Sequence, residues 1–169
     1  MGIRTSSLSF ILGMGMLLAG CGSLNGAAPE ERSLDLAVLH KGSQCGASTP
    51  APGAFWIDRP QDLPPALGRP GRQALPEGLQ WNAESEGALW IHMGAQPTGG
   101  YGLELTNPAA SVREGMATVQ ITWRRPAPDR FVTQAFTSPC LLLKMPKAGI
   151  KSILVVDQEG RQRLLVELP

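Results

Sequence analysis

The clearest structural signal in the sequence is the stretch Ala117-Thr118-Val119-Gln120-Ile121-Thr122-Trp123. Its apolar and polar residues alternate strictly, which is the period of a β-strand with one buried side and one side in water. Residues 117–123 therefore predict a strand in a half-buried sheet, with the apolar side chains in the core.

Short apolar runs on both sides of this stretch extend the pattern, separated by clusters of turn residues. The expected strands are residues 34–40, 54–57, 88–93, 101–106, 117–123, 140–145, 152–156 and 162–168, and residues 130–137 are expected to run back after a turn. Because of Pro64 and Pro65, we expect at most one short helix in residues 60–67. Seven to eight short strands favour a mainly β domain over residues 34–169, an antiparallel sandwich or a partly open barrel.

The charge of the chain narrows the choice of partner. The 169 residues carry 15 Lys and Arg against 14 Asp and Glu, a formal net charge of +1. Binding to nucleic acid is usually accompanied by a strongly basic face or stripe, so we expect no nucleic-acid partner. The length suits a single domain.

The amino-terminal residues have the pattern of a secretion signal. Arg4 precedes an uncharged, largely apolar stretch that ends in Leu18-Ala19-Gly20-Cys21, which matches the bacterial lipobox. A transmembrane anchor is the alternative, but the apolar run is too short for a span and contains two glycines. We expect residues 1–20 to be a lipoprotein signal peptide and Cys21 to be the lipidated residue.

Residues 21–33 are rich in small and polar residues and predict a flexible tether behind the lipid. Two or three acyl chains would hold the protein firmly at a membrane. The expected location is the cell envelope. Because Gly22 rather than Asp follows the cysteine, it would be the periplasmic face of the outer membrane in a Gram-negative host.

The two remaining cysteines, Cys45 and Cys140, form an even pair. In an oxidising compartment such a pair is usually bridged, which here would close a loop of about 95 residues. The functional alternative is a thiolate nucleophile, one of these cysteines activated by His40 or His92.

The sequence contains no recognised catalytic motif. Neither His40 nor His92 has a second ligand at a metal-motif spacing, and the acidic pair Glu84 and Glu86 fits a solvated turn. We expect a protein that is not an enzyme, with no catalytic residue, metal, cofactor or small-molecule substrate.

One expected loop differs in composition from the predicted strands around it. Its sequence is Met93-Gly94-Ala95-Gln96-Pro97-Thr98-Gly99-Gly100-Tyr101. Pro97 fixes its backbone, while Gly99 and Gly100 permit a left-handed turn or a close approach. These properties suit either a tight hairpin connection or a stiff, exposed binding loop.

This loop resembles that of the PrcB family of protease-complex subunits, which carries G-x-x-P-T-G-G-Y between two strands. The matching residues are Gly94, Pro97, Thr98, Gly99, Gly100 and Tyr101, and a second similar block covers residues 132–139 and 143–146. The resemblance extends over about residues 88–146; Cys140, where an aromatic residue is expected, and the insertion at 68–80 depart from it. It implies a lipid-anchored, non-catalytic protein that assembles with or stabilises a secreted protease. The partner-binding loop would be formed by Gln96, Pro97, Thr98, Gly99, Gly100 and Tyr101.

The same loop is also similar to the N-P-T-T-G-Y loop of chagasin-type cysteine protease inhibitors, which are immunoglobulin-like sandwiches. Gln96 stands where that family has Asn, and Gly99 where it has Thr. A second tryptophan-bearing loop of those inhibitors resembles Trp123-Arg124-Arg125-Pro126 only in part. This resemblance implies an inhibitor whose loop enters a protease cleft.

Overall fold

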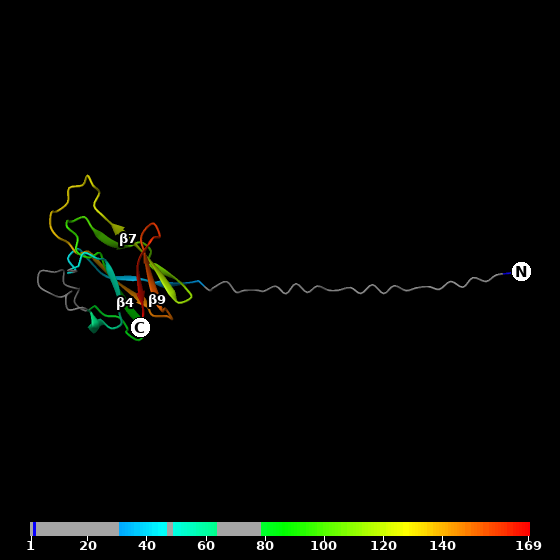
Figure 1. The fold of residues 1–169 in the computed structure, drawn as a ribbon. Coiled ribbons are helices and arrows are strands. Elements are labelled where there is room, and N and C mark those ends of the chain that lie inside the picture. The colour runs from blue at the N-terminus through cyan, green and yellow to red at the C-terminus, as the bar shows by residue number, and fades with distance from the viewer. Residues whose placement is uncertain (1, 3–30, 47–48, 64–78) are drawn as a thin grey trace.

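The structure is a computed structural model that describes residues 2, 31–46, 49–63 and 79–169. In these ranges ten strands form two sheets, and one short 3-10 turn, η1 (Pro60–Asp62), precedes β4 (Figure 1). The strands are β1 (Arg32–Asp35), β2 (Ala37–Gly42), β3 (Gly53–Ile57), β4 (Glu86–His92), β5 (Gly102–Leu105), β6 (Ala109–Arg113), β7 (Met116–Arg124), β8 (Cys140–Pro146), β9 (Ser152–Val156) and β10 (Gln162–Glu167). The mainly β, sandwich-like fold is confirmed, with more strands than the seven or eight expected.

The first sheet is built around β7, in the order β1-β6-β7-β9-β10. β5 and β6 lie end to end along one edge of β7, with Leu105 opposite Ile121 and Ser111 opposite Thr118. The opposite edge of β7 pairs with β9 in parallel, whereas the other pairs of strands are antiparallel. This parallel pair is an exception to the expected antiparallel sheet.

A tight hairpin turn connects β6 to β7. Its two central residues, Glu114 and Gly115, both have positive φ angles, 53° and 85°. Two central residues in the left-handed backbone conformation are characteristic of a type I′ turn. The twist of this turn matches that of the strands it joins. The turn therefore fixes the register of the central hairpin.

The second sheet has the order β2-β8-β4-β3, and its two central strands are buried on both faces. One face of β4 and β8 packs on the first sheet through residues such as Leu89 and Leu143. The other face packs Trp90 and Leu142 against Trp81. This double burial explains why both segments are almost continuously apolar.

The alternating residues of β7 behave as the sequence predicts. Its buried side chains belong to the core between the sheets, and its polar side chains are partly exposed. The buried residues are Ala117, Val119, Ile121 and Trp123. A strand with this period thus carries the centre of one sheet.

Three segments differ from the expected arrangement. The expected strand at 34–40 is two strands, β1 and β2, because the chain passes from one sheet to the other at Leu36. β6 was not expected, since Ala109-Ala110-Ser111 lacks strand-forming side chains. Residues 130–137 form no continuous strand, because their backbone pairs with a loop at only a few positions.

The amino-terminal predictions lie mostly outside the described residues. These are the signal peptide, Cys21 and most of the tether, as well as most of the connection at 68–80. Arg32 and Ser33, assigned above to the tether, lie in β1 and pair with Val112 and Ser111. None of the helices in the described part of the chain is long and apolar enough to span a membrane.

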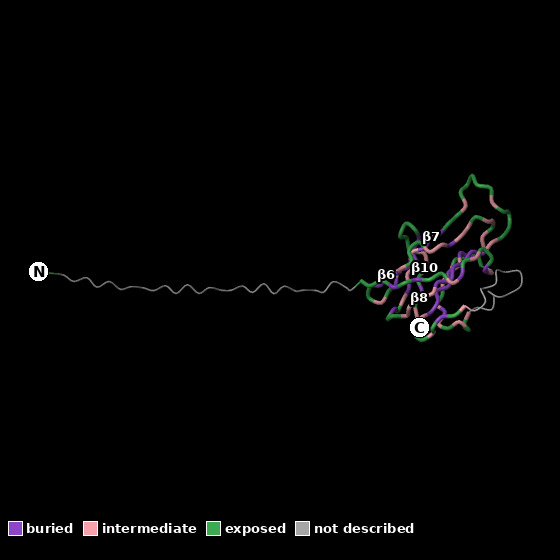
Figure 2. The backbone as a smooth tube through the Cα atoms, turned by 180° about the vertical axis from the view of Figure 1, so that it is seen from behind, coloured by how far each residue is buried: buried purple, intermediate pink, exposed green. Residues whose placement is uncertain are grey.

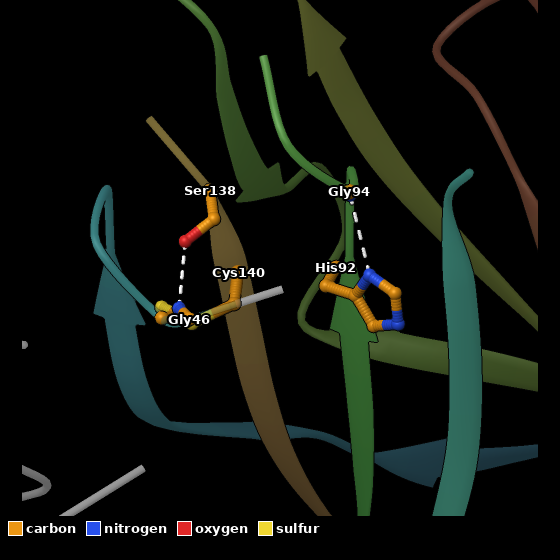
Figure 3. The surroundings of a disulfide bond; sticks show 6 residues. Gly46, His92, Gly94, Ser138 and Cys140 are labelled. Carbon is orange, nitrogen blue, oxygen red and sulfur yellow. Dashed lines mark hydrogen bonds between the residues drawn. A yellow bond between two sulfur atoms is a disulfide. The ribbon is translucent and has the colours of Figure 1, made fainter. Parts of the chain in front are cut away.

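A disulfide joins Cys45, in the loop after β2, to Cys140 at the start of β8, as the cysteine parity predicts (Figure 3). Their Cα atoms lie 5.9 Å apart, within the usual range for a bridge. Beside it, the amide of Gly46 donates a hydrogen bond of 2.6 Å to Ser138 Oγ. Both cysteines are buried, so the bridge is part of the packed interior.

Replacing both cysteines, Cys45→Ala with Cys140→Ala, should lower the free energy of unfolding by about 2–4 kcal/mol, because the unfolded chain regains the freedom that the closed loop removed. Urea unfolding followed by tryptophan fluorescence measures the loss. The reduced wild-type protein is the control and should unfold near the same midpoint as the variant. An unchanged midpoint in the variant would show that the bridge adds no stability.

Candidate functional site

The loop singled out by the sequence connects β4 to β5 at one end of the sandwich. Pro97 and Gly100 are exposed, and the other residues expected to bind the partner are half-buried: Gln96, Thr98, Gly99 and Tyr101. The loop is therefore at the surface, but it is not a free-standing tip.

A second segment, residues 125–137, covers one side of this loop; we call it the arm. It links β7 to β8 and is exposed along most of its length (Figure 2). The amide of Gly99 donates to the carbonyl of Thr133 at 2.8 Å. Gln96 and Thr137 exchange two backbone hydrogen bonds of 2.7 and 2.9 Å, and Thr137 Oγ1 donates to the Thr98 carbonyl at 2.8 Å. These bonds join the loop and the arm into one unit.

Gly100 allows the loop to lie close to the arm because it has no side chain. Its φ angle is 86°, and an added Cβ would lie 2.9 Å from Pro126 Cβ and 3.0 Å from Val132 Cγ1. Both the backbone angle and the space therefore favour glycine at this position.

Gly94 has the same role at the start of the loop. Its φ angle is 78°, and an added Cβ would lie 2.6 Å from the carbonyl oxygen of Ala51. The Ala95 amide donates to the Thr49 carbonyl at 2.7 Å. The segment before β3 thus supports the loop on its other side.

The disulfide lies at the base of the arm. Next to Cys45, Gln44 Nε2 donates to the carbonyl of Phe136 at 3.0 Å, and the amide of Cys45 donates to the Ser138 carbonyl at 3.0 Å. Across the arm's end, the Met93 amide donates to the Pro139 carbonyl at 2.9 Å. The bridge therefore helps to fix where the arm leaves the sheet.

The two histidines lie in different surroundings. His40 is 8% exposed, and its Nε2 has no hydrogen-bond partner in the described part of the chain. Its ring lies beside Cys45 and Cys140, with one ligand atom from each residue within 4.8 Å of the others. Because the sulfurs are joined to each other, they present no thiolate to a metal or a substrate. His92 Nδ1 accepts a hydrogen bond of 3.2 Å from the Gly94 amide (Figure 3).

The acidic pair expected to lie in a solvated turn is split between two roles. Glu86 belongs to β4, forms a 2.9 Å ion pair with Lys144, and accepts a hydrogen bond from the Asn82 amide. These contacts with Lys144 and Asn82 lower the pKa of Glu86. The amide of Glu84 donates to Asn82 Oδ1, which shapes the turn before the strand. The carboxylate of Glu86 thus supports the fold, whereas Glu84 lies exposed in the turn as expected.

Taken together, the fold and the site define a class: a disulfide-linked β-sandwich that presents a rigid loop and arm at one end. Residues 88–146, from β4 to the end of β8, match the family model described as PrcB C-terminal. The match supports the PrcB family over this part of the chain, in line with the resemblance in the sequence, and it suggests a role associated with a protease complex. No curated protein and no solved structure shows significant similarity to the chain.

The structure shows why the two similar blocks of sequence occur together. The first block forms the loop and the second begins in the arm, and their hydrogen bonds link residues more than thirty positions apart. Sequence reasoning named both blocks but did not predict this contact. The order of the two motifs was the signal that could have indicated it. Cys140, the departure from the family pattern, is explained by its bridge to Cys45.

Lowering the pH should destabilise the protein through the buried His40 and the half-buried His92. Burial lowers the pKa of His40 and of His92 below 6.5, so the folded state keeps these rings neutral where the unfolded chain already binds protons. Their contribution to stability is complete above pH 6.5 and falls as the pH drops below that value. The free energy of unfolding should thus be lower at about pH 5 than at about pH 7.5.

The variant His40→Leu isolates one ring in this experiment. Its stability should fall less between the two pH values than that of the wild type, with the remaining change due largely to His92. Urea titrations at both pH values give the comparison. The same pH dependence in variant and wild type would contradict the assignment to His40.

Proposed function

We propose that this protein is a lipid-anchored, non-catalytic component of the cell envelope that binds or stabilises a secreted protease or another envelope protein through the loop of residues 96–101. The proposal combines the lipobox at Cys21, the PrcB C-terminal match and the exposed unit of loop and arm. Each of these supports one part: the anchor, the class of partner and the contact surface.

The observation that carries the proposal is that contacts with the arm support the loop at the surface of the domain. A hairpin that only connected two strands would not need a second segment to support it. Here Gly99, Gly100 and Thr98 all contact the arm, while Pro97 remains exposed. A stiff exposed surface loses little conformational entropy on binding, which favours association with a protein.

The position of the loop fits a protein tethered at its amino terminus. Arg32 pairs with Val112, close to the turn that precedes β7. The arm begins after Arg124, at the far end of this nine-residue strand, about 25–30 Å away. Figure 1 shows the arm and the start of β1 at opposite ends of the sandwich. A lipidated tether leading into β1 would leave the loop directed away from the anchor.

Inhibition of a cysteine protease is the second candidate function. One observation favours it: Tyr101, from the loop, and Arg124, Arg125 and Pro126, from the other similar segment, line the same pocket. Two loops placed side by side could enter a protease cleft together.

The variant Gly100→Ala should reduce capture of the partner. An added methyl group would contact Pro126 and Val132 and would strain a left-handed residue, so the loop would move away from the arm. In cells, the full-length protein would be cross-linked and purified, and the co-purifying proteases quantified by mass spectrometry. We expect about ten-fold less protease with the variant than with the wild type.

Gly115→Ala is the matched control. Gly115 is also left-handed, but it lies in the turn at the opposite end, where an added Cβ would make ordinary contacts with Lys151 and the Gly149 carbonyl. This control should capture as much protease as the wild type. Stoichiometric inhibition of papain by the purified protein, with no protease partner in cells, would favour the inhibitor. Equal capture by wild type and Gly100→Ala, or no envelope protein captured at all, would contradict the proposal.

A further inference from the structure

A groove between the loop and the arm lies next to a smaller pocket. The groove has a volume of about 700 Å³ and is lined by Gly100, Tyr101, Arg124 and residues 125–127 and 130–133 of the arm. The smaller pocket, of about 270 Å³, is lined by residues of the loop and of the segment before β3, together with Trp123 and Arg163. Tyr101 and Arg125 line both, so the two are adjacent, and we call them together the basic groove.

The charged residues that line the basic groove are all basic. Four of its lining residues are arginines: Arg124, Arg125, Arg130 and Arg163. None of its lining residues is Asp or Glu. This local excess of positive charge contrasts with the nearly neutral chain as a whole.

Two of these arginines are held by the protein itself. Arg124 Nη2 lies 3.4 Å from Glu104 Oε1, and the hydrogen bond from Lys41 and the charge of Arg124 lower the pKa of Glu104. The guanidinium of Arg163 stacks 4.8 Å from the centre of the Trp123 ring. These contacts fix two walls of the groove before any partner arrives.

The other two arginines, Arg125 and Arg130, are exposed and have no carboxylate within 4.0 Å among the described residues. The arm contains one acidic residue, the exposed Asp129, against these two arginines. A guanidinium presents its donors in a planar fork that fits a carboxylate, often through two parallel hydrogen bonds. Arg125 and Arg130 are therefore available to bind carboxylates from another molecule.

Apolar surface lies next to these charges. Tyr101 and Val132 line the groove and are half-buried, and Phe131 on its rim is fully exposed. A second phenylalanine of the arm, Phe136, is 78% exposed. Aromatic residues and arginines are the side chains most enriched where protein interfaces gain their binding energy.

We propose that the basic groove binds an acidic, extended segment of the protein partner, with carboxylates on Arg125 and Arg130 and an apolar side chain against Tyr101 and Val132. The proposal rests on the proposed function, because it names the chemistry of the partner bound at the same end of the domain. It adds that the partner must carry negative charge at the contact. The loop of residues 96–101 alone would not require this, because it has no charged side chain.

The observations favour a peptide over a polyanion with a phosphate backbone. Proteins that bind nucleic acid or anionic lipid spread many Lys and Arg side chains over a face or stripe. The basic groove has four arginines and no lysine, and its lining includes apolar and aromatic side chains. Paired arginines beside an aromatic residue suit a segment in which carboxylates flank an apolar side chain.

The test uses the purified full-length protein and two pools of fluorescent decapeptides with a central Phe. The first pool has Asp or Glu at four fixed positions, and the second has Asn or Gln at the same positions. Fluorescence anisotropy gives the apparent affinity for each pool. We expect the acidic pool to bind at least about ten-fold more tightly, and this preference to be lost in the variant R125Q/R130Q.

Arg113→Gln is the matched control. Arg113 is exposed and pairs with Glu31 at the end of the sandwich opposite the arm, so its loss should leave the preference unchanged. Equal binding of the two pools, no binding of the acidic pool, or an unchanged preference in R125Q/R130Q would overturn the proposal. A different outcome would assign the groove to lipid phosphates instead. In that case the wild type binds phosphatidylglycerol vesicles but not the acidic pool, and R125Q/R130Q does not bind the vesicles.

Failure of this inference can be distinguished from failure of the proposed function. The cellular cross-linking experiment is repeated with the variant R125Q/R130Q. If the variant captures as much protease as the wild type, the proposed function stands, but the binding of an acidic segment in the groove is refuted. A wild type that captures no envelope protein would refute the proposed function, whatever the peptides show.

Discussion

The backbone contact between the loop and the arm is the interaction on which the proposed binding surface depends. Gln96 pairs with Thr137, and the Gly99 amide bonds to Thr133. Without these bonds the loop would be an ordinary connection between two strands, and the arm would be an exposed connection that does not contact the loop. With them, two segments that are distant in sequence form one exposed unit with a basic groove between them.

The rest of the sandwich serves to hold this contact in place. β4 leads directly into the loop, and the arm leads into β8; these two strands pair with each other and are buried on both faces. The disulfide fixes the start of β8 to the loop after β2, beside the base of the arm. Because the sheet is rigid there, the separation between the two ends of the binding unit is set by strand pairing.

The sequence predicted those features that depend on a local pattern. The alternation in β7 and the loop with its glycines were identified from residues close together in the chain, and the bridge between Cys45 and Cys140 from the even number of remaining cysteines. The contact of Gly100 with Pro126 and Val132 was not, because it joins segments that no local period relates. The basic groove was missed for the same reason: Arg125 and Arg163 line the same pocket only after the sheets have formed. β6 was missed because its pairing with β7, rather than its own side chains, makes it a strand.

The most direct measurement is the rate of amide hydrogen exchange at Gly99, read by NMR in the isolated protein. The only hydrogen bond described for this amide crosses from the loop to the carbonyl of Thr133 in the arm. If the two segments form one unit before any partner binds, Gly99 should exchange about a hundred-fold more slowly than an unstructured glycine. Exchange at the unstructured rate, in a protein whose β4 and β8 amides are protected, would show that the loop and the arm are not joined.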